Sequence, residues 1–251
     1  MPKKWRLIPH MEAAGTQQMA IDSWLLNQHM QGLQPPSLRF YTWAKPTISL
    51  GYHQRQFPAH WNHLIYKGEP VELVRRPTGG RAVLHQGDLT YALVTSGVNG
   101  SRRVVYEHLC QFLIEGWKTL GVELSFGVAG RGYVKNPNCF GTATAADLVM
   151  ADGCKLIGSA QVYKEDCVLQ HGSIRLNPDN DLFEAVFGER ITQPKILSDL
   201  SSIKGISQIE DFLTIAAESR FNAELSVKSM TAVEVENAMR SQPIRLAQPS
   251  T

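Results

Sequence analysis

Cysteine is scarce in this chain, and its spacing suits neither a metal site nor a disulfide framework. The four cysteines are Cys110, Cys139, Cys154 and Cys167, and no two of them form a C-x-x-C pair. Structural zinc sites use such short spacings, and small secreted domains carry cysteine at much higher density. We therefore expect reduced thiols and no metal-binding residues.

The chain also lacks a large excess of charge of either sign. Charged residues make up 19% of the 251 residues, and the formal net charge is +2. This balance argues against a nucleic-acid partner, which would need an extended basic surface. Any acidic partner must meet a local basic patch.

Long apolar runs and internal boundaries are missing as well. No stretch approaches the roughly 18 apolar residues of a membrane-spanning helix, and the N-terminal sequence M-P-K-K-W-R-L-I-P-H has no apolar run of signal-peptide length behind it. No linker, repeat or low-complexity tract divides the chain. These absences predict a cytoplasmic protein, not bound to a membrane, with a single domain over 1–251 and a core over about 5–241.

Hydrophobic periodicity predicts both helices and strands. Three- and four-residue spacing indicates helices over 13–30 and 101–120. Aromatic and β-branched residues indicate strands over 37–43 and 47–51, which we expect to pair as a hairpin. Asp152-Gly153 is typical of a two-residue turn and predicts a meander of antiparallel strands around it.

One stretch, V-E-L-V-R-R-P-T-G-G-R-A-V-L-H, joins an apolar strand, a glycine turn and a second apolar run. Arg75 and Arg76 precede the turn, and Arg81 follows it. Paired glycines let the backbone approach a ligand closely, and guanidinium groups offer forked donors to a carboxylate, phosphate or carbonyl. An edge hairpin with a solvated basic tip is the alternative that this stretch leaves open.

Two other residues are candidates for chemistry. Strand alternation places Lys155 on the face of Ser159 and opposite Gly158, and a lysine in such a strand is commonly a surface charge. Cys139 lies in an irregular, glycine-rich loop predicted over 126–144. A cytosolic cysteine is more often a small hydrophobe than a nucleophile, so the residue patterns alone leave both roles open.

These motifs together resemble a known family. R-R-P-T-G-G-R-A-V-L-H resembles the R-R-x-x-G-G-x-x-V-x-H signature of the lipoate-protein ligase A and octanoyltransferase superfamily, relatives of biotin-protein ligases. D-G-C-K-L-I-G-S-A-Q and L-Q-H-G-S-I are similar to its lysine and H-G-S/T segments, and N-C-F-G-T-A-T-A-A-D-L-V to the cysteine segment of its ligase-like octanoyltransferases and amidotransferases. The resemblance implies an α/β (α+β) fold with a mixed, mainly antiparallel sheet flanked by helices, as in class II synthetase-like catalytic domains.

The resemblance also implies roles for individual residues. Cys139 is expected to carry the acyl group as a thioester, and Lys155 to polarise the acyl carbonyl. His85 and His171 are assigned to the site wall, since the sequence predicts no third group that would orient either imidazole. Asp88 and Tyr91 are expected to support the glycine turn. The expected substrate-binding residues are Arg75, Arg76, Thr78, Gly79, Gly80, Arg81, His85, Gly158, Ser159, Ala160, His171 and Gly172.

The implied reaction is transfer of an octanoyl or lipoyl group from octanoyl-acyl carrier protein to a lysine of a lipoyl domain, without a cofactor. Acceptors would be the glycine cleavage H protein or dehydrogenase E2, and the enzyme would be a monomer. The alternatives are an ATP- and Mg²⁺-dependent lipoate-protein ligase, a lipoyl amidotransferase, a non-catalytic acyl- or lipoyl-domain-binding module and, fitting less well, a biotin-protein ligase. Cys139 and the expected lack of a C-terminal accessory domain argue against the ligase.

Overall fold

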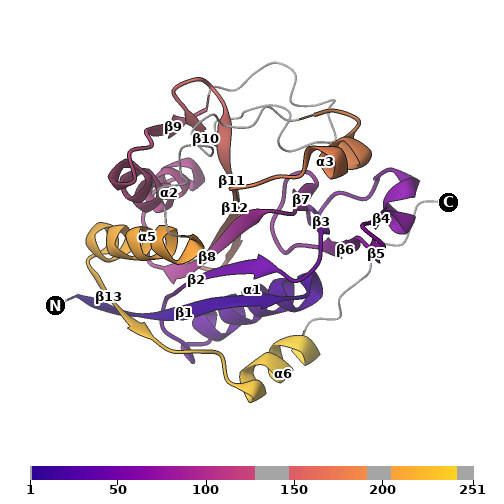
Figure 1. Cartoon of the computed structure of the whole chain (residues 1–251). Helices are drawn as coiled ribbons and strands as arrows, with labels where there is room; N and C mark the ends of the chain where they lie inside the picture. Colours follow the sequence, from indigo (N-terminus) through magenta and orange to yellow (C-terminus); the bar gives the residue numbers. More distant parts are fainter. Residues whose placement is uncertain (1, 128–146, 191–204, 242–251) are drawn as a thin grey trace.

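An eight-stranded mixed sheet forms the framework of the molecule (Figure 1). The computed structural model describes residues 2–127, 147–190 and 205–241. The strands of this sheet are β1 (Lys3–Ala13), β2 (Ser37–Trp43), β8 (Asp88–Ser96), β9 (Leu124–Phe126), β10 (Asp147–Met150), β11 (Lys155–Lys164), β12 (Cys167–Arg175) and β13 (Ala223–Val227).

Most neighbouring strands in this sheet are antiparallel. The spatial order is β13-β1-β2-β8-β12-β11-β10-β9. Only the two pairings made by β1, with β13 and with β2, are parallel within the described part of this sheet. The predicted mixed, mainly antiparallel sheet and the β10-β11-β12 meander are therefore confirmed. Strand β1 was not predicted.

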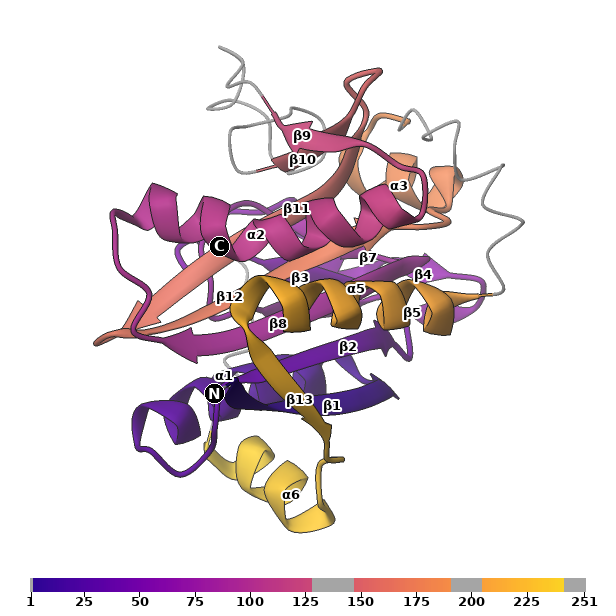
Figure 2. The same cartoon turned by 90° about the vertical axis from the view of Figure 1, so that its left-hand side faces the viewer.

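Helices cover both faces of the sheet (Figure 2). Helices α2 (Arg102–Thr119) and α5 (Ile206–Phe221) lie side by side on one face, and α1 (Gly15–Met30) lies on the other. Helix α6 (Ala232–Ser241) packs against α1. The helices predicted over 13–30 and 101–120 are confirmed to within two residues at each end. No helix among the described residues is long and apolar enough to cross a membrane.

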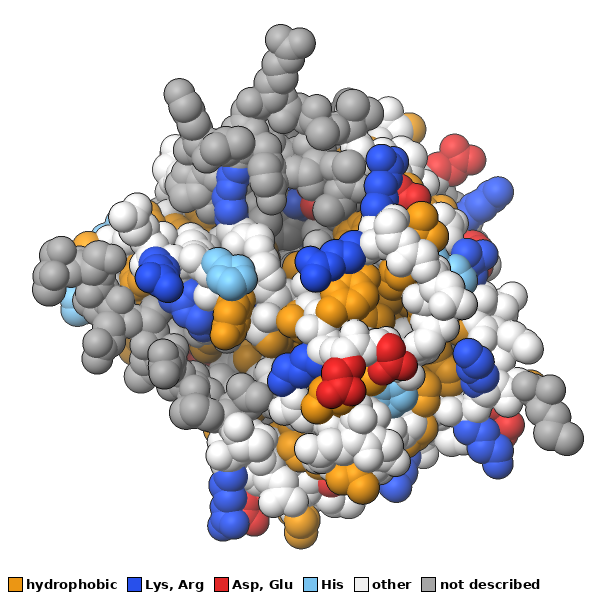
Figure 3. Space-filling view, turned by 180° about the vertical axis from the view of Figure 1, so that it is seen from behind, with side chains coloured by type: hydrophobic (Ala, Val, Ile, Leu, Met, Phe, Trp, Pro, Cys, Tyr) orange, Lys and Arg blue, Asp and Glu red, His pale blue; other side chains and the backbone are white. Residues whose placement is uncertain are grey.

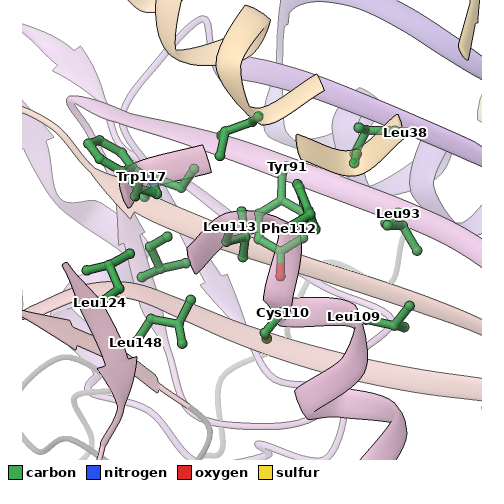
Figure 4. Packing of buried hydrophobic residues seen from close by; sticks show 14 of the residues in the cluster. Leu38, Tyr91, Leu93, Leu109, Cys110, Phe112, Leu113, Trp117, Leu124 and Leu148 are labelled. Carbon is green, nitrogen blue, oxygen red and sulfur yellow. The ribbon is translucent and has the colours of Figure 1, made fainter. Parts of the chain in front are cut away.

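The largest hydrophobic cluster lies between the sheet and the α2–α5 layer (Figure 4). The rings of Tyr91 and Phe112 meet edge-on with their centroids 5.6 Å apart, and Phe112 also contacts Phe221 of α5 at 5.8 Å. The two helices approach closely at Gly116, where a Cβ would lie 2.7 Å from a methyl group of Leu213. The opposite face packs in part against α1 through a second hydrophobic cluster, and it also carries buried polar groups.

A separate three-stranded sheet carries the glycine turn. Its central strand β3 (Thr47–Leu50) pairs with β6 (Glu72–Arg75) in parallel and with β7 (Val83–His85) in antiparallel orientation. The hairpin predicted from 37–43 and 47–51 is wrong, because β2 joins the large sheet and β3 the small one. The edge-hairpin alternative for the glycine turn is also wrong, because β3 lies between β6 and β7.

Short elements cover the outer side of this small sheet. Leu182, Phe183 and Val186 of one helix pack with Trp61 over Ile48. The indole Nε1 of Trp61 donates to the carbonyl of Val186 at 2.9 Å. The elements concerned are the 3₁₀ helix η1 (Ala59–His63), β4 (Ile65–Tyr66), β5 (Glu69–Pro70) and α3 (Asn180–Phe187).

We expect Phe112→Ala to lower the free energy of unfolding by about 3–5 kcal/mol, because it removes buried surface and leaves a cavity. Val104→Ala on the same helix is the matched control. The Val104 side chain is 51% exposed, so the change should stay within about 0.5 kcal/mol. Urea denaturation measures the free energy of unfolding of both variants. Equal losses would contradict the burial of Phe112 between the sheet and the α2–α5 layer.

Candidate active site

A pocket opens between the large sheet and the small sheet, on the α1 side of the large sheet. Its empty volume is about 660 Å³. One wall comes from β10, β11 and β12, and the facing wall from β3, β7 and the glycine turn. The predicted site residues that line it are Arg76, Gly80, Lys155, His85, Gly158, Ser159, Ala160, His171 and Gly172.

Lys155 is a buried cation on the β11 wall of this pocket. It is 5% exposed, and its Nζ lies 2.8 Å from Oδ1 of Asp147. Strand β11 carries one extra residue opposite the Leu148–Val149 step, and this bulge interrupts the alternation of side chains. A Cβ on Gly158 would lie 3.0 Å from the Lys155 Nζ. The prediction that Lys155 and Gly158 face opposite ways is therefore wrong.

His171 is held between a carboxylate and the glycine turn. Its Nδ1 lies 2.8 Å from Oδ2 of Asp22, and its Nε2 lies 2.6 Å from Oγ1 of Thr78. The carboxylate accepts from Nδ1–H, which leaves Nε2 to accept from the threonine hydroxyl. Asp22 also accepts from Tyr41 at 2.9 Å and from Arg39 at 3.2 Å, and all these groups are buried.

His85 makes a second chain of the same kind. Its Nδ1 lies 2.8 Å from Oδ2 of Asp88, and its Nε2 lies 2.9 Å from the hydroxyl of Ser49. The imidazole stacks on Trp43 with the ring centroids 3.9 Å apart. Burial lowers the pKa of His85, although the Asp88 carboxylate opposes this, so the ring is neutral at pH 7.

Carboxylates thus orient both imidazoles, contrary to the expectation that no third group would do so. Both chains end on hydroxyls that belong to the glycine turn or lie beside it, which favours a positioning role. Asp88 supports the turn as predicted, through His85. Tyr91 does not. It lies on the α2 side of the sheet, and its hydroxyl donates to Ser159 at 2.8 Å.

The two arginines before the turn bind the backbone instead of pointing into open space. Arg76 donates to the carbonyls of Ser49, Gly79 and Arg81 at 2.8, 2.7 and 2.6 Å. Arg75 donates to the carbonyls of Gly51 and Gln54, both at 2.7 Å. Arg76 therefore braces the turn, Arg75 braces the stretch after β3 on which the turn rests, and Arg81 lies half-buried just beyond the turn.

The turn rests directly on the strand end at Gly51. A Cβ on Gly51 would lie 1.9 Å from the carbonyl oxygen of Gly80. The amide of Tyr52 donates to the carbonyl of Thr78 at 2.8 Å. Gly80 has a φ of 92°, a conformation that favours glycine. Gly51 was not predicted as a site residue, because its importance comes from a contact between distant parts of the chain.

Sequence reasoning also missed Asp22 and Asp147. Asp22 is the single acidic residue within α1, and this was the available signal. Asp147 stands in the D-L-V sequence that ends the cysteine segment. No local pattern indicates that it pairs with Lys155.

The described cysteines are all protonated thiols at neutral pH. Burial raises the pKa of Cys110 to about 12. Burial, with the neighbouring Asp166 carboxylate, raises the pKa of Cys167 to about 11, and burial also raises the pKa of Cys154. Cys139 and most of the loop predicted over 126–144 lie outside the described residues. Within the described ranges, no three His, Cys, Asp or Glu side chains are grouped to hold a metal ion.

The fold and the pocket define a class of α/β catalytic domain, in which a mixed sheet presents a buried lysine to a braced glycine turn. The chain belongs to the lipoyl protein ligase A/B catalytic domain family, whose model matches residues 14–228.

Its curated relatives are octanoyltransferases. Octanoyltransferase LipM of Carboxydothermus hydrogenoformans is 37% identical over 213 residues, which cover 83% of this chain and 78% of that protein. LipM of Halalkalibacterium halodurans is 37% identical over 188 residues, covering 70% and 67%. The chain is therefore a transferase of the octanoyltransferase branch.

Solved structures establish the fold independently. A T. acidophilum protein with bound lipoic acid superposes with a TM-score of 0.77 at 21% identity, covering 96% of this chain and 94% of that one. A lipoate-protein ligase A bound with ATP gives a TM-score of 0.75 at 20% identity, with the same coverage.

The contact between Gly51 and the turn can be tested through stability. We expect Gly51→Ala to lower the free energy of unfolding by about 1–3 kcal/mol, because the new methyl group must displace backbone. Nothing lies within 4 Å of a Cβ on Gly79, so Gly79→Ala should stay within about 0.5 kcal/mol. If urea denaturation shows the reverse order, the close approach of Gly51 to Gly80 is not present in solution.

The pH dependence of stability should reveal His85. Its pKa is lowered in the folded state, so the unfolded chain binds more protons below the ordinary pKa of about 6.5. The free energy of unfolding should therefore fall as the pH drops below about 6.5, by at most about 1.4 kcal/mol per pH unit from this group. Urea unfolding between about pH 7.5 and pH 5.5 should show a flatter slope in His85→Gln but not in the exposed His53→Gln. An unchanged slope in His85→Gln would contradict the assignment.

Proposed function

We propose that this transferase moves an octanoyl group from octanoyl-acyl carrier protein to a lysine of a lipoyl domain, through a thioester on Cys139. The acceptor would be the glycine cleavage H protein or the E2 subunit of a dehydrogenase. The reaction would run in the cytoplasm, within one catalytic domain and without ATP.

The observation that carries this proposal is the position of Asp147. Gly127 and Asp147 are the described residues on either side of 128–146, and the Gly127 amide donates to the Asp147 carbonyl at 2.8 Å. Asp147 is paired with Lys155 in the pocket. The described residues that flank the part of the chain holding Cys139 therefore lie beside the buried lysine, which supports the proposal. Cys110, Cys154 and Cys167 are poor candidates because their pKa values are raised.

The reaction would proceed in two acyl-transfer steps, each a nucleophilic attack on the acyl carbonyl. The Cys139 thiolate attacks the carbonyl carbon of the donor thioester, and collapse of the tetrahedral intermediate expels the pantetheine sulfur, which takes a proton. The neutral ε-amine of the acceptor lysine then attacks the S-octanoyl carbonyl, loses a proton and releases Cys139 as a thiolate. The product is an amide, and the thioester donor is already activated.

Lys155 would stabilise the charge that develops in both steps. Its ammonium is buried in the pocket, where an interaction with an oxyanion is stronger than in bulk solvent. Nearby cationic charge also favours the thiolate of a cysteine, which is the nucleophilic form.

Intact mass measurement after incubation with octanoyl-acyl carrier protein, in the absence of ATP, tests the proposal. We expect the wild type and Cys154→Ala each to gain one octanoyl group, and Cys139→Ala to gain none, because thioester formation needs the thiol. Cys154→Ala is the matched control, since it removes a half-buried thiol that the mechanism does not use. Addition of a lipoyl domain should move the group from the enzyme to that domain.

Other results would identify the alternatives. Modification of the lipoyl domain only with ATP, Mg²⁺ and free lipoate or octanoate would make this a ligase, and Cys139 would then be incidental. Loading of Cys139 from an octanoylated lipoyl protein but not from the carrier protein would make it an amidotransferase.

A further inference from the structure

A second, wider cavity adjoins the pocket on the α1 side of the large sheet. Its lining includes Met19 and Ala20 of α1, Val162 of β11 and the stretch from Tyr52 to Arg55. Met19 and Arg76 line both this cavity and the pocket, so the two are direct neighbours. We call this cavity the cationic groove, because it is lined by arginine and lysine side chains.

The charged side chains that line the groove are all positive. Arg55, Arg102 and Lys164 are exposed there, beside the braced Arg75 and Arg76, and no Asp or Glu belongs to its described lining. The guanidinium of Arg102 lies over the Tyr163 ring at 5.4 Å. Such a concentration of one sign contrasts with the net charge of +2 for the whole chain.

The exposed cations are not neutralised by the described part of the chain. Lys164 donates to the amide oxygen of Asn27 at 2.6 Å, and none of Arg55, Arg102 and Lys164 forms an ion pair with a described carboxylate. Glu165 and Asp166 follow Lys164 but do not line the groove. Figure 3 shows the back of the molecule, where Lys and Arg side chains lie around exposed hydrophobic ones and acidic side chains lie among them.

We propose that the cationic groove docks the acyl donor as an acidic carrier protein, whose arm runs along the groove into the pocket. This inference rests on the proposed function. The thioester must reach Lys155, so the rest of the donor stays outside the pocket, where the groove begins. Its apolar floor at Met19, Ala20 and Val162 suits a linear arm, and its exposed cations suit carboxylates of the carrier.

The positive charge of the cationic groove favours the acyl donor over the acceptor lipoyl domain as the partner that binds there. The acceptor presents a lysine whose ordinary pKa is about 10.4, so it arrives as a cation at neutral pH. A surface lined by positive charge alone repels that group. An acidic carrier is attracted, and complementary charge accelerates association at low salt.

The test compares Arg102→Glu with Arg103→Glu. Arg103 neighbours Arg102 at the start of α2, but it pairs with Glu107 and does not line the groove. Acidic residues are favourable at a helix N-terminus, so neither change should impair folding. We expect Arg102→Glu to lower the second-order rate constant of enzyme acylation by octanoyl-acyl carrier protein about tenfold at low salt. The loss should shrink at high salt, where exposed charges are screened.

The test measures enzyme acylation by three donors, and it measures transfer onto the lipoyl domain separately. Octanoyl-pantetheine, which is neutral, and octanoyl-coenzyme A, a small anion, should each acylate Arg102→Glu within about twofold of wild type. An equal loss with octanoyl-coenzyme A would overturn carrier docking, because the groove would then bind phosphate. A loss confined to transfer onto the lipoyl domain would make the groove an acceptor site. No loss, or the same loss in Arg103→Glu, would also overturn the inference.

The same experiment separates the two proposals. If wild-type enzyme forms the Cys139 adduct and Arg102→Glu behaves like wild type, the docking inference fails and the proposed function stands. If no donor acylates the wild type, the proposed function itself fails.

Discussion

Because the Asp22 carboxylate is fully buried, it must keep its hydrogen-bond partners, and the α1 side of the site depends on this constraint. Removing a carboxylate from water costs several kcal/mol unless charge-assisted hydrogen bonds offset the loss. Here Arg39, Tyr41 and His171 donate to it. These donors come from β2 and β12, so one charge joins α1 to two strands of the large sheet. Because the Nδ1–H of His171 donates a hydrogen bond to Asp22, its Nε2 can accept one from the hydroxyl of Thr78 in the glycine turn.

Local patterns predicted most of the elements but few of the contacts that build the site. The period of α2, the Asp152-Gly153 turn and the meander could be recognised from neighbouring residues. Strand β1 could not, because Pro9 interrupts its pattern and falls where the β1–β2 register shifts between Ile8 and Met11. The face of Lys155 was predicted wrongly for a related reason. A bulge adds one residue to β11 opposite β10. The register between the two strands cannot be read from the sequence of either strand alone.

The guanidinium groups show how far composition can mislead about function. Arginines beside paired glycines suggest a ligand-binding tip, yet Arg75 and Arg76 donate to backbone carbonyls of the turn and of the strand end beside it. Buried carbonyls need donors, and a fork that reaches two or three of them fixes a turn that has no strand ladder. The resemblance to the family identified these positions, but only distances between atoms assign them to bracing. Gly51 belongs to the same arrangement and has no signal in the sequence.

The shared fold explains why the pocket alone does not distinguish transfer from ligation. Both reactions need an acyl carbonyl held beside a cation and an amine brought to it, and the lipoate-ligase-like structures resemble this chain over almost its full length. They differ in how the carbonyl becomes activated. A thioester arrives activated on a large carrier, so a transferase needs a thiol and a surface for that carrier. A ligase must instead bind ATP and counter its phosphate charge. Positive charge outside the pocket would serve either chemistry, but the exposed position of Arg55, Arg102 and Lys164 suits contact with a macromolecule better than enclosure of a small anion.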